Sequence, residues 1–358
     1  MTFQSKNLQL VQLLRGIASL LVVLLHITRG SSEILDKIFL LNFFSFGGAG
    51  VDIFFVLSGF IITYTSQKNI GYADKLPSFV KRRFVRIFPT YWIIISLFLL
   101  LQIMLPSFYK THFSLDIKNI LSTYLLFPGH IMVNGVSWTL SYELFFYLLF
   151  CVAFLIPNKK LSFGLAAIST VIIIMLPVFG YDYKNENYWV NLITFPMNIE
   201  FFMGILAVVI IPHISVKTSL AFISVGCITF LMSIGLYNLN YYFTADNFNR
   251  VIFFGIPSFF IITGIVKYEL SNKIKVAKVF MLLGEASYSL YLLHLPLVIA
   301  AIRILSKFNI KNNILIHVLL ILVVGIICYT SIAFYKFVEK PIIMKLNSLR
   351  RIKVANEI

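Results

Sequence analysis

Apolar stretches of about 20 residues recur along the whole of this chain, and short polar segments separate them. A helix needs about this length to cross the hydrocarbon core of a membrane. In that medium only helices and closed barrels satisfy their own backbone hydrogen bonds, and unbroken apolar runs favour the helix. The sequence therefore predicts an all-α fold, a polytopic bundle of transmembrane helices.

We expect about ten spans, and they leave no part of the chain for a sizeable soluble domain. One transmembrane domain is expected over 1–345, followed by a basic cytoplasmic tail over 346–358. The segment 114–135 is apolar but is interrupted at Pro128, so its topology stays open. The predicted spans lie near residues 8–28, 50–67, 88–108, 136–156, 161–180, 193–212, 218–238, 249–267, 279–301 and 313–337.

Composition agrees with a membrane protein and bears on the nature of its partners. Hydrophobic residues make up 59% and charged residues 12%, against roughly 25% charged in soluble domains. The net charge of +16 is typical of nucleic-acid-binding proteins too, but most of the Lys and Arg residues flank alternate spans on one side. This positive-inside pattern places both termini in the cytoplasm and argues against nucleic acid. The cysteines have no metal-type spacing, so we expect no metal.

The first predicted span carries two polar side chains, Arg15 and His26. Eleven residues of helix return to within about 20° of the same face and rise about 16 Å. Snorkelling of the arginine to headgroups and packing of the histidine are the structural alternatives. Functionally, a neutral imidazole acts as a general base, and an arginine on its face binds an anionic donor or orients the base.

Three further ionisable residues lie in or beside apolar spans. Asp52 begins a helix, where it either caps the helix or orients His26. Glu143 is an acid within a span and is a functional candidate by default. His294 is open between packing and a place in the site.

Several ordered motifs along the chain resemble those of the bacterial membrane acyltransferase-3 family, whose first signature is an Arg and a His separated by ten residues. The second signature resembles residues 46–60, Phe-Gly-Gly-Ala-Gly-Val-Asp-Ile-Phe-Phe-Val-Leu-Ser-Gly-Phe. Residues 83–92 resemble its cytoplasmic pair of arginines and the aromatic residues that follow them. Further matches are Ser137 to Glu143, Ser287 to Pro296 and Val338 to Pro341.

The resemblance implies a multi-pass protein of the bacterial inner membrane that moves an acyl group, usually acetyl from acetyl-CoA, onto a sugar hydroxyl of an envelope or secreted glycan. It implies His26 as the base, with an acyl-His26 intermediate as the competing route. Many members of the family carry an added extracytoplasmic hydrolase-like domain, for which we expect no room here. By analogy, an exopolysaccharide or a lipopolysaccharide O-antigen is favoured as acceptor.

The basic run over 81–86 offers cations to the phosphates of coenzyme A, and guanidinium groups suit phosphate. Donor binding is accordingly assigned to Arg15, Arg82, Arg83, Arg86, Tyr91 and Trp92. The catalytic candidates are His26, Glu143, Asp52 and His294, and the acceptor candidates are Trp138 and Ser141.

Two other functions fit parts of the sequence. Intramembrane Arg, Glu and His residues also occur in a transporter or flippase for a glycan precursor. A membrane subunit that binds acyl-CoA and passes acetyl groups to a separate transferase is the third possibility. Expected partners are acetyl-CoA, a lipid-linked or exported glycan and membrane lipids, and a homo-oligomer stays open.

Overall fold

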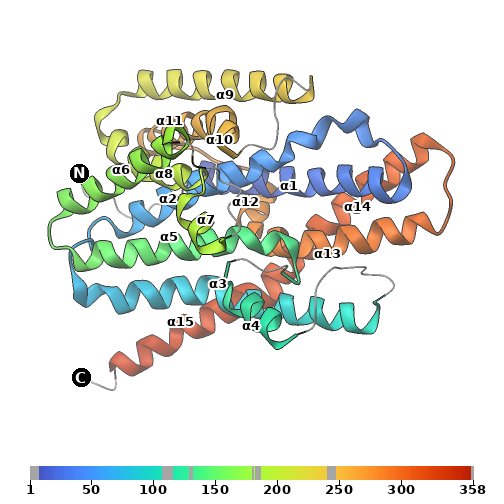
Figure 1. Cartoon of the computed structure of the whole chain (residues 1–358), viewed down its shortest axis with the longest axis horizontal. Coiled ribbons are helices and arrows are strands. Elements are labelled where there is room, and N and C mark those ends of the chain that lie inside the picture. The colour runs from blue at the N-terminus through green and yellow to red at the C-terminus, as the bar shows by residue number, and fades with distance from the viewer. Residues whose placement is uncertain are drawn as a thin grey trace.

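The computed structural model describes residues 8–106, 116–128, 132–179, 181, 187–239 and 247–355, and this part of the chain consists of helices joined by turns and short irregular segments, without a strand. The long helices run roughly parallel to one another along the longest axis of the molecule (Figure 1). These helices are α1 Gln9–Leu35, α2 Ala49–Ser66, α3 Leu76–Met104, α5 Trp138–Leu155, α6 Lys159–Met175, α8 Asn198–Ile210, α9 Val216–Asn238, α11 Ile256–Ser271, α13 Ser287–Ser306 and α14 Asn313–Phe334.

Shorter helical segments connect or extend the long ones. The α-helical segments are α4 Ile117–Leu125, α7 Tyr188–Thr194, α10 Asn247–Arg250, α12 Lys278–Glu285 and α15 Lys340–Ala355. Two π-helices, η6 Val251–Gly255 and η7 Tyr335–Glu339, precede α11 and follow α14. The 3-10 segments are η1 Phe39–Gly48, η2 Ala73–Lys75, η3 Gly135–Ser137, η4 Leu176–Phe179 and η5 Ile211–His213.

Within the described residues, nine helical stretches are long and apolar enough to cross a membrane, which confirms the predicted class of fold. The one remaining predicted span, near 161–180, is α6, and its 17 residues are fewer than those of each of the other nine stretches. In the ambiguous segment 114–135, the described part forms the short helix α4. The tail beyond 345 continues α15 to Ala355, and residues 356–358 lie outside the described part.

The start of α3 differs from the prediction. The sequence placed this span at 88–108, after the basic run over 81–86, whereas the helix begins at Leu76 with Pro77 in its first turn. Proline suits that position because the first helical N–H groups need no partner within the helix. The basic run therefore lies on a helix, with Arg82 and Arg86 four residues apart.

Helix α1 lies in the interior of the bundle and contacts η1, α2, α12 and α13 (Figure 1). The glycines before and within the first turn of α2 allow a very close crossing. A Cβ atom on Gly47 would lie 2.2 Å from the carbonyl oxygen of Leu21, and one on Gly50 would lie 2.2 Å from that of Ala18. Small residues let membrane helices approach in this way.

Helix α2 meets α8 through a second close contact. A Cβ atom on Gly59 would lie 2.0 Å from the carbonyl oxygen of Phe201, and one on Gly204 would lie 2.2 Å from that of Val56. Because backbone occupies these positions, a methyl group cannot be accommodated by a change of rotamer. The crossing holds α2 between α1 and α8.

We expect Gly59→Ala to lower the apparent melting temperature of the purified protein in detergent. The added methyl group forces the α2–α8 crossing apart, and overpacking of this kind costs roughly 1–3 kcal/mol. The matched control is Gly325→Ala in α14, where an added Cβ meets no atom within 4 Å. Equal melting temperatures for the two variants would contradict the close crossing.

Candidate active site

Two histidines from distant parts of the chain meet between α1 and α13. The Nε2 atom of His294 lies 3.3 Å from the Nδ1 atom of His26, and the rings meet edge to face with centroids 4.9 Å apart. His294 is fully buried, whereas His26 is half-buried. His26 is therefore the member of the pair that a substrate can reach.

The surrounding carbonyls determine which ring nitrogen of each histidine carries the proton. Nδ1 of His294 lies 2.6 Å from the carbonyl oxygen of Tyr291, so it is the donor nitrogen and Nε2 is an acceptor. Nδ1 of His26 lies 2.8 Å from the carbonyl oxygen of Val22 and also faces the acceptor Nε2 of His294, so it too carries a proton. The lone pair of neutral His26 is consequently on Nε2. That nitrogen has the chemistry of a general base.

A cavity lies between α1, α2, α3, α5 and α13. Its walls are mostly apolar, but Arg15, Arg86 and Glu143 line it as well. The full lining is Arg15, Val51, Phe54, Phe55, Leu57, Ser58, Ile61, Arg86, Thr139, Leu140, Glu143, Ser287, Tyr288 and Tyr291.

Tyr291 forms part of the cavity wall one helical turn before His294. Its hydroxyl lies 2.8 Å from Oγ1 of Thr139 and donates a 3.0 Å hydrogen bond to the carbonyl oxygen of Val136. Its ring lies 5.8 Å from that of His294. Tyr291 thus separates the cavity from the histidine pair and touches both.

The two arginines of the cavity are not in direct salt bridges. Among the described residues, ion pairs within 4 Å join Lys75 to Asp74 and Arg250 to Asp52. Arg15 is buried and donates to Gln12 at 3.2 Å. Arg15 and Arg86 both interact electrostatically with Glu143 and Glu339 over longer distances. Their guanidinium groups therefore keep donors for an anionic ligand.

Tyr147 lies between Glu143 and Arg83 of α3 and contacts both. The hydroxyl of Tyr147 donates to Oε1 of Glu143. The guanidinium of Arg83 lies over the ring of Tyr147, 5.3 Å from its centroid, and donates to Thr65 at 3.2 Å. Arg83 therefore packs beside the cavity, while Arg86 reaches it.

The remaining predicted donor residues lie elsewhere. Arg82 is exposed and donates to Ser78 at 2.6 Å. The hydroxyl of Tyr91 donates to the carbonyl oxygen of Thr123 at 2.8 Å, and Nε1 of Trp92 donates to that of Tyr124 at 2.9 Å. Tyr91 and Trp92 hold α4 against α3 and do not line the cavity, because their positions on α3 face the short helix.

The predicted acceptor residues are also packed within the bundle. The ring of Trp138 lies edge-on to those of Phe55, Tyr142 and Phe195, at centroid distances between 5.7 and 6.3 Å. Ser141 is buried. Neither residue lines the cavity, although their neighbours Thr139 and Leu140 do.

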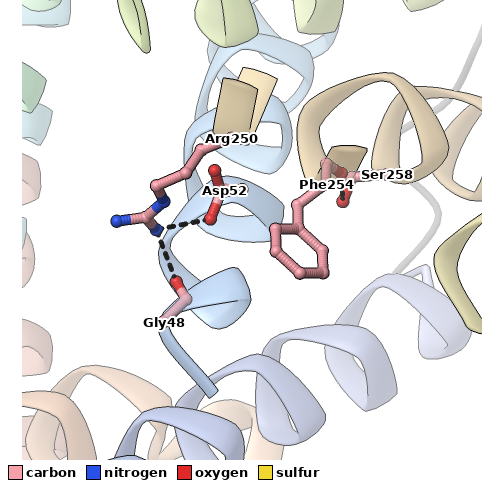
Figure 2. Close-up of polar contacts among 5 residues, drawn as sticks. All are labelled: Gly48, Asp52, Arg250, Phe254 and Ser258. Atoms are coloured by element: carbon pink, nitrogen blue, oxygen red, sulfur yellow. Dashed lines mark hydrogen bonds and ion pairs between the residues drawn. The ribbon is translucent and has the colours of Figure 1, made fainter. Parts of the chain in front are cut away.

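Asp52 has a partner that neither of its expected roles included. Figure 2 shows the Arg250 guanidinium donating to Oδ2 of Asp52 at 2.6 Å and to the carbonyl oxygen of Gly48 at 2.8 Å. The Asp52 side chain makes no capping hydrogen bond at the start of α2. Asp52 therefore joins α2 to α10 and does not contact His26.

Comparison with known proteins identifies the class of this chain. Residues 9–334 match the family described as an acyltransferase domain. The chain belongs to the acyltransferase-3 family. It is 25% identical over 271 residues to the exopolysaccharide production protein ExoZ of Rhizobium meliloti (strain 1021), an alignment that covers 70% of this chain and 76% of that protein. No solved structure is significantly similar to it.

Family membership confirms the resemblance drawn from the motifs and makes this multi-pass protein a membrane acyltransferase. The structure adds residues that sequence reasoning did not select, although most lie inside those motifs. Tyr288 and Tyr291 line the cavity. Glu339, in η7, accepts a hydrogen bond from Ser289 and faces both cavity arginines. The signal in the sequence that could have identified them is a polar residue near the end of a helix, within one of the family motifs.

We expect His294→Phe to lower kcat of the acyltransferase roughly 10- to 150-fold while leaving KM for both substrates nearly unchanged. With His26 as the base, loss of the Nε2 acceptor removes the hydrogen bond to His26 at the stage when its ring is positively charged, and such bonds contribute roughly 1.5–3 kcal/mol. Steady-state kinetics measures the split between kcat and KM. A variant that is folded and fully active would show that His294 only packs.

Proposed function

We propose that this protein is an O-acetyltransferase of the bacterial cytoplasmic membrane, which moves an acetyl group from acetyl-CoA onto a sugar hydroxyl of an exopolysaccharide. The observation that carries the proposal is the pairing of His26 with His294, which leaves Nε2 of His26 as the basic nitrogen. Tyr291 adjoins this pair and lines a cavity that two arginines also line. The similarity to a protein of exopolysaccharide production supports the acceptor class.

The donor enters from the side of the bundle where Arg15 and Arg86 lie. The cavity has a volume of about 70 Å³, which is room for roughly five water molecules. Such a space admits the acetyl thioester end of the donor and excludes a nucleotide, so the nucleotide phosphates stay outside. The guanidinium groups of Arg15 and Arg86 at the cavity, together with the other arginines of α3, attract those phosphates.

In the proposed reaction, Nε2 of His26 takes the proton of the sugar hydroxyl as its oxygen attacks the thioester carbonyl carbon. The new C–O bond forms, the C–S bond breaks, and the proton passes from the imidazolium to the leaving thiolate. The products are an O-acetyl sugar and free coenzyme A. His294 accepts a hydrogen bond from Nδ1 of His26 throughout, which stabilises the positive charge on that ring.

We expect His26→Ala to abolish transfer of labelled acetyl groups to exopolysaccharide by the purified protein in nanodiscs. Loss of general-base catalysis alone costs about 10²- to 10⁴-fold in kcat. His317→Ala, at a half-buried histidine of α14 that does not line the cavity, is the matched control and is expected to keep full activity. Acetylation that persists in a folded His26→Ala sample rules out His26 as base, and acetyl groups trapped covalently on His26 of the wild type establish the acyl-enzyme route instead.

Arg86→Gln is expected to raise KM for acetyl-CoA roughly tenfold or more, because hydrogen bonds to charged groups contribute about 1.5–3 kcal/mol. Arg82→Gln removes an exposed arginine from the same helix and is expected to change this KM less than twofold. Isothermal titration with coenzyme A provides the same comparison without catalysis. Equal effects of the two substitutions would mean that the arginines of α3 bind the donor only through their overall charge.

A further inference from the structure

A buried group of three ionisable side chains lies at the start of α2, apart from the acyl-transfer cavity. Asp52 comes from α2, Glu200 from α8 and Arg250 from α10, and both carboxyl groups are completely buried. We propose that Asp52 and Glu200 share one proton, which makes this junction of three helices a proton-binding site.

The charges of the group do not balance unless one carboxyl group is neutral. Arg250 supplies one positive charge, and it pairs with Asp52 at 2.6 Å. Removing a second, unpaired carboxylate from water costs several kcal/mol. A carboxyl group that carries a proton avoids that cost, and the remaining pair is neutral overall.

The hydrogen bonds lead to the same conclusion independently. Oδ1 of Asp52 and both carboxyl oxygens of Glu200 accept no hydrogen bond from any described donor. The two carboxyl groups lie within hydrogen-bonding reach of each other. Two carboxylates cannot bond to each other, since neither has a hydrogen to donate, whereas a carboxylic acid donates to a carboxylate. One proton between them gives a partner to Oδ1 of Asp52 and to one carboxyl oxygen of Glu200.

The proton belongs to Glu200, because Arg250 directs its bonds to Asp52 and Gly48 (Figure 2). The backbone of the π-helix η6 closes the other side of Glu200. A Cβ atom on Gly255 would lie only 2.7 Å from Oε1 of Glu200, so the carboxyl group is held against a helix that offers no side chain there.

The charged and titratable groups around the pair are few among the described residues. Arg250 faces it from α10, and Tyr237 of α9 and Tyr291 of α13 interact with Arg250. Within this part of the chain, the proton therefore has no competing base apart from the two carboxyl groups themselves.

The group of Asp52, Glu200 and Arg250 supports α1, the helix that carries His26, through the start of α2. Arg250 fixes Gly48 and Asp52 at the start of α2, where Gly50 lies against Ala18 of α1. A Cβ atom on Gly50 would also lie 2.9 Å from the side chain of Val22, whose carbonyl oxygen accepts the hydrogen bond of His26. If Glu200 were ionised, its carboxylate would compete with Asp52 for Arg250 and weaken the contact between α2 and α1.

Infrared difference spectroscopy of the purified protein at neutral pH tests the proposal without any assay of acyl transfer. The wild type minus Glu200→Gln is expected to show the carbonyl band of a protonated carboxylic acid. Asp52→Asn should lose that band too, because Arg250 then stabilises an ionised Glu200. Glu33→Gln, an exposed acid of α1, is the matched control and keeps the band. A difference spectrum that shows only carboxylate bands for Glu200 would overturn the proposal.

Thermal unfolding provides a second measurement that stays informative where a variant folds poorly. Glu200→Gln retains a donor for Asp52 and is expected to melt near the wild type, whereas Glu200→Ala leaves Oδ1 of Asp52 without a partner and melts clearly lower. If Glu200 were an ionised partner of Arg250, Glu200→Gln would lose an ion pair and melt as low as Glu200→Ala. Either outcome leaves the assignment of the acyl-transfer reaction unaffected.

Discussion

The cost of placing charge inside a helix bundle that crosses a membrane constrains every polar residue described above. An ionised group there is stable only with a partner or with access to water. Asp52 has Arg250, while Glu143 accepts from Tyr147 and interacts at longer range with the cavity arginines. The arginines of the cavity depart from this pattern, since neither forms a close salt bridge among the described residues. Where other buried charges are paired, two arginines without a close carboxylate partner are what we expect of a site that binds an anion.

Two local departures from α-helical geometry place charged residues in this interior. Arg250 immediately precedes the π-helix η6, and Glu339 ends the π-helix η7. A π-turn adds a residue to the helix and rotates the side chains that follow, and such turns occur frequently at functional sites. Hydrophobic periodicity does not reveal them, because both segments remain helical. This explains why sequence reasoning overlooked Arg250 and gave Glu339 no role.

The sequence was sufficient for the class of fold and for the face of α1 that carries Arg15 and His26, because both depend on local patterns. The partners of these residues depend on which helices pack together, and His294 lies 268 positions away from His26. Sequence therefore left His294 open between packing and function. It also assigned Tyr91 and Trp92 to the donor, because motif membership does not tell which face of α3 they occupy. The bonds of both residues to α4 explain their place without any ligand.

A second histidine is a suitable partner for His26, the proposed base, in an apolar interior. A carboxylate beside His26 would strengthen the base, but it would bring a negative charge into the apolar interior and require a cation of its own, as Asp52 does. Neutral His294 accepts the same hydrogen bond through Nε2, and carbonyl oxygens of its own helix satisfy its Nδ1. The pair therefore orients the imidazole at little electrostatic cost in the resting state. In the proposed reaction, the charge arises only while His26 holds the proton of the sugar hydroxyl, and the lone pair on Nε2 of His294 already faces that ring.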